Sequence, residues 1–378
     1  MIFIVACLSI TYVTLIFLYV YGWVNLSSVP ATPDFVPQTG VCIVIPARNE
    51  AHRLAACIES VRAQNYPLPL FDLIVVDDHS TDDTAAIAAR YADDVCLIRL
   101  AEVLQGEDLP KAYKKKAIET AIAHTQRELI VTTDADCTMP TDWLRNIVHG
   151  YETTQAHIVA APVQYVRAQT FVERFQTLDF IGMMVATGAS LHLRLATMCN
   201  GANLAYRRQT FYEVGGFAGI NHLASGDDML LMAKIAQRYP KGIIFLKQLS
   251  ATVSTYAQPT WADFAQQRLR WASKSTSYQD RRITLFLAAV YLFNLTIVGC
   301  FGVAVLCGSG YYGQLGGYAL GIKMLADAIF LSTGCAFFRR TDLLWWLIPA
   351  QIVHILYIIV IGTWGNTGNY TWKGRKMS

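Results

Sequence analysis

VCIVIPARNE (residues 41–50) places a run of β-branched and apolar residues directly before a polar turn. Two further stretches, FDLIVVDD (71–78) and ELIVTTDAD (128–136), repeat this arrangement, and amphipathic helical segments separate the three. Strands that alternate with helices indicate βαβ units. The sequence therefore predicts an α/β fold with a mixed, mostly parallel sheet flanked by helices.

Polar side chains follow each of these predicted strands. Residues 46–50 follow the first strand, Asp77 and Asp78 the second, and Asp134 and Asp136 the third. Open sheets of this kind bind their ligands beyond the carboxyl ends of the strands, so we expect these groups to meet in one crevice. Capping of the following helix is the alternative explanation for the Asp77–Asp78 turn.

The pair Asp134 and Asp136 is the candidate metal site. Asp134-Ala135-Asp136 is expected to end the strand, so the alternation of its side chains puts the two carboxylates on the same side. One or two carboxylates together with substrate phosphates commonly hold Mg²⁺ in proteins, and such an ion would neutralise the charge on a departing diphosphate. We therefore expect Mg²⁺ or Mn²⁺ at this position.

Other polar groups at strand and helix ends could bind a nucleotide. The Asp77–Asp78 pair could accept hydrogen bonds from a base or a ribose, and Arg48 could hold a phosphate. Lysines 114–116 begin a helix whose positive end favours anions. In the first half of the chain, the residues predicted to bind such a nucleotide donor are Pro46, Arg48, Glu50, Asp77, Asp78, Lys116 and Asp134.

The second half of the chain carries two more motifs. In SGDDML (225–230), Asp227 and Asp228 precede an apolar helical stretch, where one of them could cap the helix or act as a general base toward an attacking hydroxyl. In QQRLRW (266–271), the two arginines could stabilise a diphosphate, and Trp271 could stack on a sugar or lie at a lipid interface. An amphipathic interface helix would explain the second motif equally well.

Composition indicates a membrane protein. The mean hydropathy is +0.31 and only 16% of the residues are charged, while residues 1–33, 283–322 and 343–372 carry no Asp, Glu, Lys or Arg. About 20 apolar residues suffice to span a bilayer. A net charge of +3 gives no argument for nucleic-acid binding. The nine cysteines show no C-x-x-C and no metal-ligand spacing, and several fall in predicted strands or spans. We interpret them as small buried hydrophobic residues in a reducing compartment.

These runs also predict a topology. Residues 1–24 lack the basic start of a signal peptide, so we expect an uncleaved anchor, followed by a proline-containing linker at 25–40. Basic residues before the run at 283 put the catalytic domain in the cytoplasm. Three C-terminal spans would then leave a basic tail outside, so we expect a cytoplasmic tail. Either one segment, for example the last, is re-entrant or interfacial, or the tail returns to the cytoplasmic surface by another route. Lys323 and Asp327 are expected to form an internal ion pair.

Taken in order, these motifs resemble the family 2 inverting glycosyltransferases of the membrane-embedded type, which include cellulose, chitin and hyaluronan synthases and ceramide glucosyltransferase. The resemblance implies a GT-A fold, a UDP-sugar donor and a general base at Asp228, with Asp227 as its rival. It implies that Asp77 and Asp78 contact the uridine and that Asp134 and Asp136 hold the metal and diphosphate. It also places several residues around the diphosphate and the acceptor, namely Gly201, Asn203, Gln267, Arg268, Arg270 and Trp271.

The expected organisation follows from these observations. A GT-A catalytic domain occupies residues 41–282, with a nucleotide-sugar half at 41–150 and an acceptor half at 151–282, and it precedes transmembrane helices at 283–363 and a basic tail at 364–378. We expect a multi-pass protein of the inner (plasma) membrane that transfers one sugar to a lipid or lipid-linked acceptor. A processive polysaccharide synthase and a non-catalytic membrane scaffold are the alternatives. A dinucleotide-dependent oxidoreductase is excluded because no G-x-G-x-x-G follows the first strand.

Overall fold

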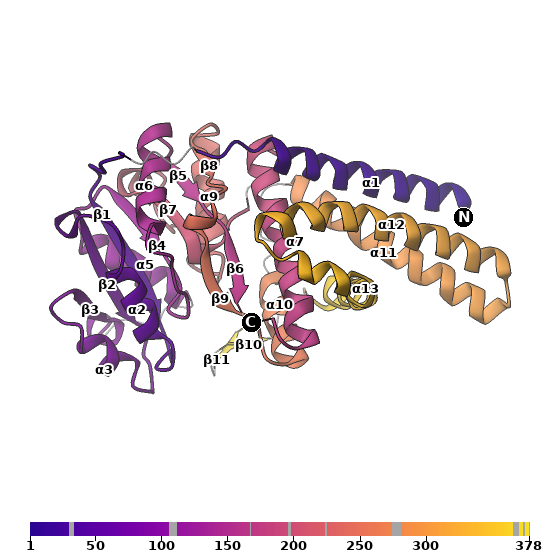
Figure 1. Cartoon of the computed structure of the whole chain (residues 1–378). Helices are drawn as coiled ribbons and strands as arrows, with labels where there is room; N and C mark the ends of the chain where they lie inside the picture. The colour runs from indigo at the N-terminus through magenta and orange to yellow at the C-terminus, as the bar shows by residue number, and fades with distance from the viewer. Residues whose placement is uncertain are drawn as a thin grey trace.

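The computed structural model describes residues 1–29, 34–105, 112–166, 168–195, 198–223, 225–273, 281–365, 370–372 and 375–377. An α/β domain lies at one end of the molecule, and long helices extend from its other end (Figure 1). Pro30 and Pro33 of the predicted linker lie outside the described residues. The chain thus combines a sheet-based domain with a helical bundle.

The central sheet has seven strands in the order β3-β2-β1-β4-β7-β5-β8. Strand β7 runs antiparallel to its neighbours β4 and β5, and the other pairs are parallel. The prediction of a mixed, mostly parallel sheet is therefore confirmed. The strand bounds are β1 (Val41–Ala47), β2 (Phe71–Asp77), β3 (Val95–Arg99), β4 (Leu129–Thr132), β5 (Ile158–Ala160), β7 (Leu204–Arg207) and β8 (Ile243–Phe245).

Helices cover both faces of this sheet, which explains the nearly continuous apolar runs in its strands. Val41 and Ile43 of β1 alternate with Cys42 and Val44, and the two sets belong to different hydrophobic clusters. The first cluster includes α2 (Leu54–Arg62) and α6 (Trp143–Thr154), and the second includes α5 (Tyr113–Ala123) and α9 (Asp227–Arg238). The sheet core is thus buried on both sides.

Smaller elements complete the domain. Strands β6 (Val163–Val166) and β9 (Val253–Tyr256) form a separate parallel pair. Short helices connect the larger elements, and their bounds are η1 (Leu68–Leu70), α3 (Thr84–Ala89), α4 (Leu100–Val103), η2 (Gly201–Asn203), α8 (Arg208–Glu213) and η3 (Leu249–Ala251).

Three long helices form the bundle: α1 (Ile2–Asn25), α11 (Arg281–Cys307) and α12 (Gly310–Phe337). They pack against one another and point away from the sheet (Figure 1). Their outer surfaces expose large apolar side chains, among them Phe3, Ile10 and Leu306. Each is long and apolar enough to cross a membrane. Helices α7 (Phe171–Leu193) and α10 (Trp261–Ala272) lie across the junction between bundle and sheet (Figure 1).

The last helix, α13 (Leu347–Trp364), follows η5 (Thr341–Trp346) and starts and ends on the sheet side of the bundle. Trp346 packs on Phe171 of α7 with ring centroids 5.8 Å apart. At the other end, any side chain added to Gly365 would collide with Ala272 of α10. The hairpin of β10 (Tyr370–Trp372) and β11 (Arg375–Met377) lies beside α10. Although α13 has the composition of a span, its two ends return to the same side.

Candidate active site

One cavity of about 1480 Å³ connects the sheet to the bundle. At one end it is lined by the residues that follow β1, β2 and β4, and at the other by side chains from α1, α11, α12 and α13. Its volume exceeds the ~300–1,000 Å³ usual for a single small ligand. The cavity can therefore hold two substrates, one of them in contact with the membrane helices.

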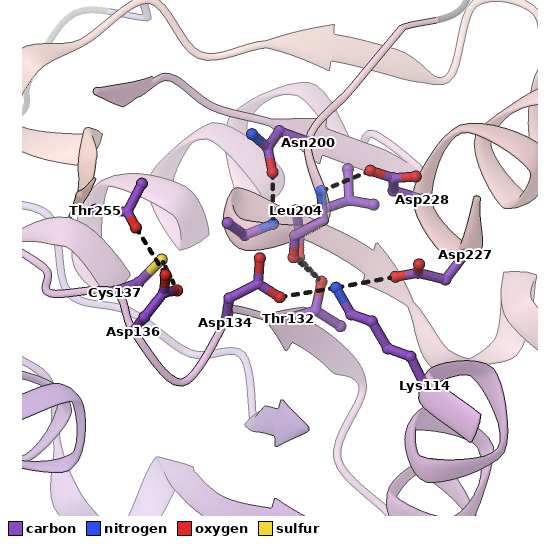
Figure 2. A network of polar contacts seen from close by, with 12 residues as sticks. Lys114, Thr132, Asp134, Asp136, Cys137, Asn200, Leu204, Asp227, Asp228 and Thr255 are labelled. Carbon is purple, nitrogen blue, oxygen red and sulfur yellow. Dashed lines mark hydrogen bonds and ion pairs between the residues drawn. The ribbon is translucent and has the colours of Figure 1, made fainter. Parts of the chain in front are cut away.

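The two aspartates of the predicted metal site do not belong to a strand. Strand β4 ends at Thr132, so Asp134 and Asp136 lie in the turn after it, and the strand-alternation argument for their orientation was wrong. Both nevertheless line the cavity. They make separate contacts. Asp136 lies 3.5 Å from the Arg53 guanidinium, and it accepts a hydrogen bond from Thr255 at 3.1 Å (Figure 2).

Lys114 links the two halves of the site. Its Nζ lies 2.7 Å from Asp134 and 3.4 Å from Asp227, so one ammonium group joins the turn after β4 to the start of α9 (Figure 2). Burial alone would lower the pKa of Lys114, but the two carboxylates raise it well above its usual range. Lys114 is therefore cationic at every physiological pH.

The donor set of this end suits a hard divalent ion that the substrate helps to bind. Asp134 is 39% exposed and Asp136 is 28% exposed, so both carboxylates can reach a ligand in the cavity. Within the described residues, no three His, Cys, Asp or Glu side chains gather around one point. The protein thus offers at most these two carboxylates here, and diphosphate and water oxygens would complete the coordination of Mg²⁺ or Mn²⁺.

Asp227 and Asp228 occupy the first turn of α9, after Gly226 in the left-handed conformation at φ 80°. A helix N-terminus stabilises negative charge. Asp227 is largely buried and faces Lys114, whereas Asp228 is more accessible and accepts a hydrogen bond from the Gly201 N–H at 3.0 Å. Both line the cavity, but Asp228 is better placed to meet a second substrate.

The segment before β7 positions this carboxylate. Gly201 lines the cavity, and a Cβ there would lie 3.3 Å from the Asp227 carboxylate, which explains the glycine. Asn203 was predicted to contact the acceptor, but it is completely buried and does not line the cavity. Its side chain donates to the Pro162 carbonyl and accepts from the Trp143 indole. Asn203 therefore holds the backbone that carries Gly201.

The motif on α10 divides into cavity-facing and buried residues. Gln267, Arg270 and Trp271 line the cavity. Arg268 also borders it, but its side chain is only 4% exposed and lies 2.6 Å from Asp179 of α7. A buried guanidinium already paired with a carboxylate has little charge left for a diphosphate, so the predicted donor role of Arg268 is not supported by this geometry.

The ends of β1 and β2 contribute the remaining predicted residues. Pro46, Arg48, Glu50 and Asp78 line the cavity, and Arg48 donates to the Asp78 carbonyl at 2.8 Å. Asp77, the last residue of β2, is buried and does not line the cavity. The prediction that all the strand-end aspartates meet in one crevice is thus wrong for Asp77.

The orientation of α5 about its axis shows that the prediction for Lys116 was wrong. Lys116 does not line the cavity, whereas Lys114 does. Lys115, between them, is buried and donates to the carbonyls of Leu223 and Ser225 at 2.6 and 2.8 Å, just before Asp227. Helical phase decides which of three consecutive lysines reaches the site, and the sequence alone does not fix it.

Sequence reasoning also missed Arg53, Thr255 and Asp179. The first two contact Asp136, and the third pairs with Arg268. The position of Arg53 one turn after the IPARNE segment was an available signal. Asp179 was detectable as an acidic residue within an otherwise apolar helical stretch, where a partner is expected.

A sheet whose strand ends offer carboxylates, next to a helix N-terminus and a lysine, is typical of the GT-A fold. Residues 42–221 match the family model for glycosyl transferase family 2. The resemblance deduced from the motifs is thereby confirmed.

Curated relatives match half or more of the chain. A glycosyltransferase named AglE from Haloferax volcanii is 27% identical over 50% of this chain and 59% of its own length. A beta-monoglucosyldiacylglycerol synthase from Synechocystis is 26% identical over 63% of this chain and 48% of its own length. The chain thus spans about half to three fifths of these relatives.

A solved structure resembles nearly the whole chain. The mannosyltransferase PcManGT from Pyrobaculum calidifontis, in complex with GDP-Man and Mn²⁺, covers 96% of this chain and 99% of its own, with a TM-score of 0.58. At 21% identity this likeness shows the fold alone.

Proposed function

We propose that this protein is a membrane-bound, inverting glycosyltransferase that transfers a sugar from a UDP-sugar to a lipid or lipid-linked acceptor. The single cavity carries the proposal: the carboxylates of the family 2 domain lie at one end, and the apolar side chains of the membrane helices lie at the other. The name of the Synechocystis relative, whose product is a glucolipid, agrees with an acceptor of this kind.

The residues at the sheet end supply the chemistry. Asp228 takes the proton of the acceptor hydroxyl as this oxygen attacks the anomeric carbon, and the bond to the diphosphate breaks in the same displacement. Lys114 and Arg270 stabilise the negative charge that develops on the diphosphate. Asp78 and Glu50 bind the nucleoside, and Trp271 stacks on the acceptor.

A divalent cation belongs to the proposed reaction. Asp134 and Asp136 would hold Mg²⁺ or Mn²⁺, and such an ion neutralises charge on the leaving diphosphate when bound. Lys114 contacts Asp134 at 2.7 Å, so the ammonium and the ion would share this carboxylate. Removal of the ion with EDTA should abolish transfer, and added Mg²⁺ or Mn²⁺ should restore it.

The proposed location is the cytoplasmic face of the inner membrane. Helix α11 leaves the sheet side and α12 returns to it, while both ends of α13 stay there. Arg282, Arg339 and Arg340 lie at the sheet-side ends of these helices, and the far turn at Gly308 and Ser309 carries no charge. Positive charge on one side favours that side as cytoplasmic, and the C-terminal hairpin lies with it.

The test is incubation of membranes with radiolabelled UDP-sugars and GDP-mannose, with and without EDTA, followed by lipid extraction. We expect one glycolipid product with one donor. Asp136→Ala should remove the product while the amount of folded protein stays the same. Label in a ladder of water-soluble chains would favour a polysaccharide synthase instead, and absence of transfer from every donor would contradict the proposal.

A further inference from the structure

The acceptor end of the cavity is lined by helices of the bundle, and its charged groups are the informative feature. Apolar side chains such as Ile16, Phe286 and Phe330 form most of this wall. Arg268 of α10 borders this wall, and Lys323 of α12 lies behind it and donates to Gln351, which lines the cavity. Whether either charge is available decides which head group can enter.

Both cations are already neutralised inside the protein. Arg268 lies 2.6 Å from Asp179, and the two side chains are 4% and 7% exposed. Lys323 is fully buried and pairs with Asp327, which also lines the cavity. Tyr12 donates to the same carboxylate. These two cations therefore add no net positive charge to the acceptor end.

The whole lining is also richer in carboxylates than in cations. A phosphorylated acceptor would bring ~1.5–2 negative charges at neutral pH, next to a base that must itself be ionised. Sites for phosphate usually offer arginine, lysine or an open helix N-terminus, and here the N-terminus of α9 carries Asp227 and Asp228. The charged residues of the lining are Arg48, Arg53, Lys114, Arg268 and Arg270 against Glu50, Asp78, Asp134, Asp136, Asp179, Asp227, Asp228, Asp263 and Asp327.

We propose that the acceptor is an uncharged lipid hydroxyl and that phosphorylated lipids are excluded by the electrostatics of the cavity. This inference rests on the proposed function and narrows its acceptor class. The cationic groups near the sheet serve the diphosphate of the donor, and the acceptor end favours a molecule with apolar chains and a neutral hydroxyl. Its oxygen becomes negative only as Asp228 takes the proton.

Two pairs of lipids that differ only in a phosphate test the proposal. Purified full-length protein in nanodiscs receives labelled donor with dioleoylglycerol or dioleoyl phosphatidic acid, or with undecaprenol or undecaprenyl phosphate. We expect the neutral member of at least one pair to be used at least about tenfold better in kcat/KM, which corresponds to ~1.4 kcal/mol. Equal or better use of the phosphorylated members would overturn the neutral-acceptor inference. Absence of transfer to any lipid would overturn the proposed function itself.

A charge variant gives an independent readout. Asp179→Asn releases the charge of Arg268 at the cavity wall, so transfer to undecaprenyl phosphate should rise relative to undecaprenol by about tenfold. Tyr357→Phe is the matched control, because Tyr357 contacts Asp179 at 3.4 Å and its replacement changes no charge. An unchanged ratio in folded Asp179→Asn protein would argue against electrostatic exclusion. If that variant does not fold, the wild-type lipid pairs decide alone.

Discussion

Two lysine–aspartate ion pairs, one in the cavity and one in the bundle, consist of the same groups but differ in their exposure. Lys114 is 25% exposed and faces Asp134, itself 39% exposed. Lys323 is completely buried, and Asp327, Gln351 and Tyr12 surround its ammonium. The first contact can be exchanged for a contact with substrate, whereas the second is complete within the protein.

This difference shows that an ion pair indicates a ligand-binding site only when its carboxylate remains accessible. The charges of the cavity should affect the rate of transfer and leave the free energy of unfolding nearly unchanged. The charges of the bundle should affect the free energy of unfolding and leave the rate of transfer nearly unchanged. The following substitutions test this difference between the cavity and the bundle.

The largest effect is expected for Asp228→Asn. Loss of the general base should lower kcat by about 10³-fold, within the range usual for such groups, while the melting temperature stays close to that of the wild type. Transfer is measured with saturating donor and acceptor, and unfolding is followed in detergent. Asp227→Asn is the matched control with a smaller effect. A greater loss in the control would assign the base to Asp227.

Lys323→Met should act on stability. It leaves the Asp327 carboxylate unpaired in the bundle, which typically costs about 3 kcal/mol or more in the free energy of unfolding. Transfer per folded molecule should persist. The double variant Lys323→Met with Asp327→Leu should recover most of the loss, because no buried charge remains. Wild-type stability in the single variant would show that water reaches this pair.

Lys114→Ala should lower kcat by about 10²-fold, as removal of a group that stabilises transition-state charge commonly does. The variant leaves Asp134 and Asp227 without their shared cation, so the donor KM should rise as well. Lys116→Ala, two residues further along the same helix and outside the cavity, is the control. Equal effects of the two substitutions would indicate a general role of the basic helix start.

Features that depend on local spacing could be predicted from the sequence, whereas contacts between distant segments could not. Periodicity and strand-end polarity predicted the sheet and the (i, i+4) pair of Lys323 and Asp327, because these depend on local spacing. The roles of Asn203 and Arg268 depended on which side chains from distant segments meet them. Trp143 and Asp179, their partners, lie 60 and 89 positions away in the chain, and no local pattern encodes those contacts.

The smallest effect is expected for Trp271→Ala, which tests whether the boundary between the two ends of the cavity binds the acceptor. The indole lines the cavity next to the Arg268 guanidinium, 4.4 Å from its ring centroid, and near Phe180. Loss of a stacking surface should raise the acceptor KM by about tenfold, or ~1.4 kcal/mol, with little change in the donor KM. Trp271→Phe retains a ring and should recover much of the affinity. Equal changes in both KM values would place Trp271 outside the acceptor subsite, since only a residue that contacts the acceptor alone separates the two constants.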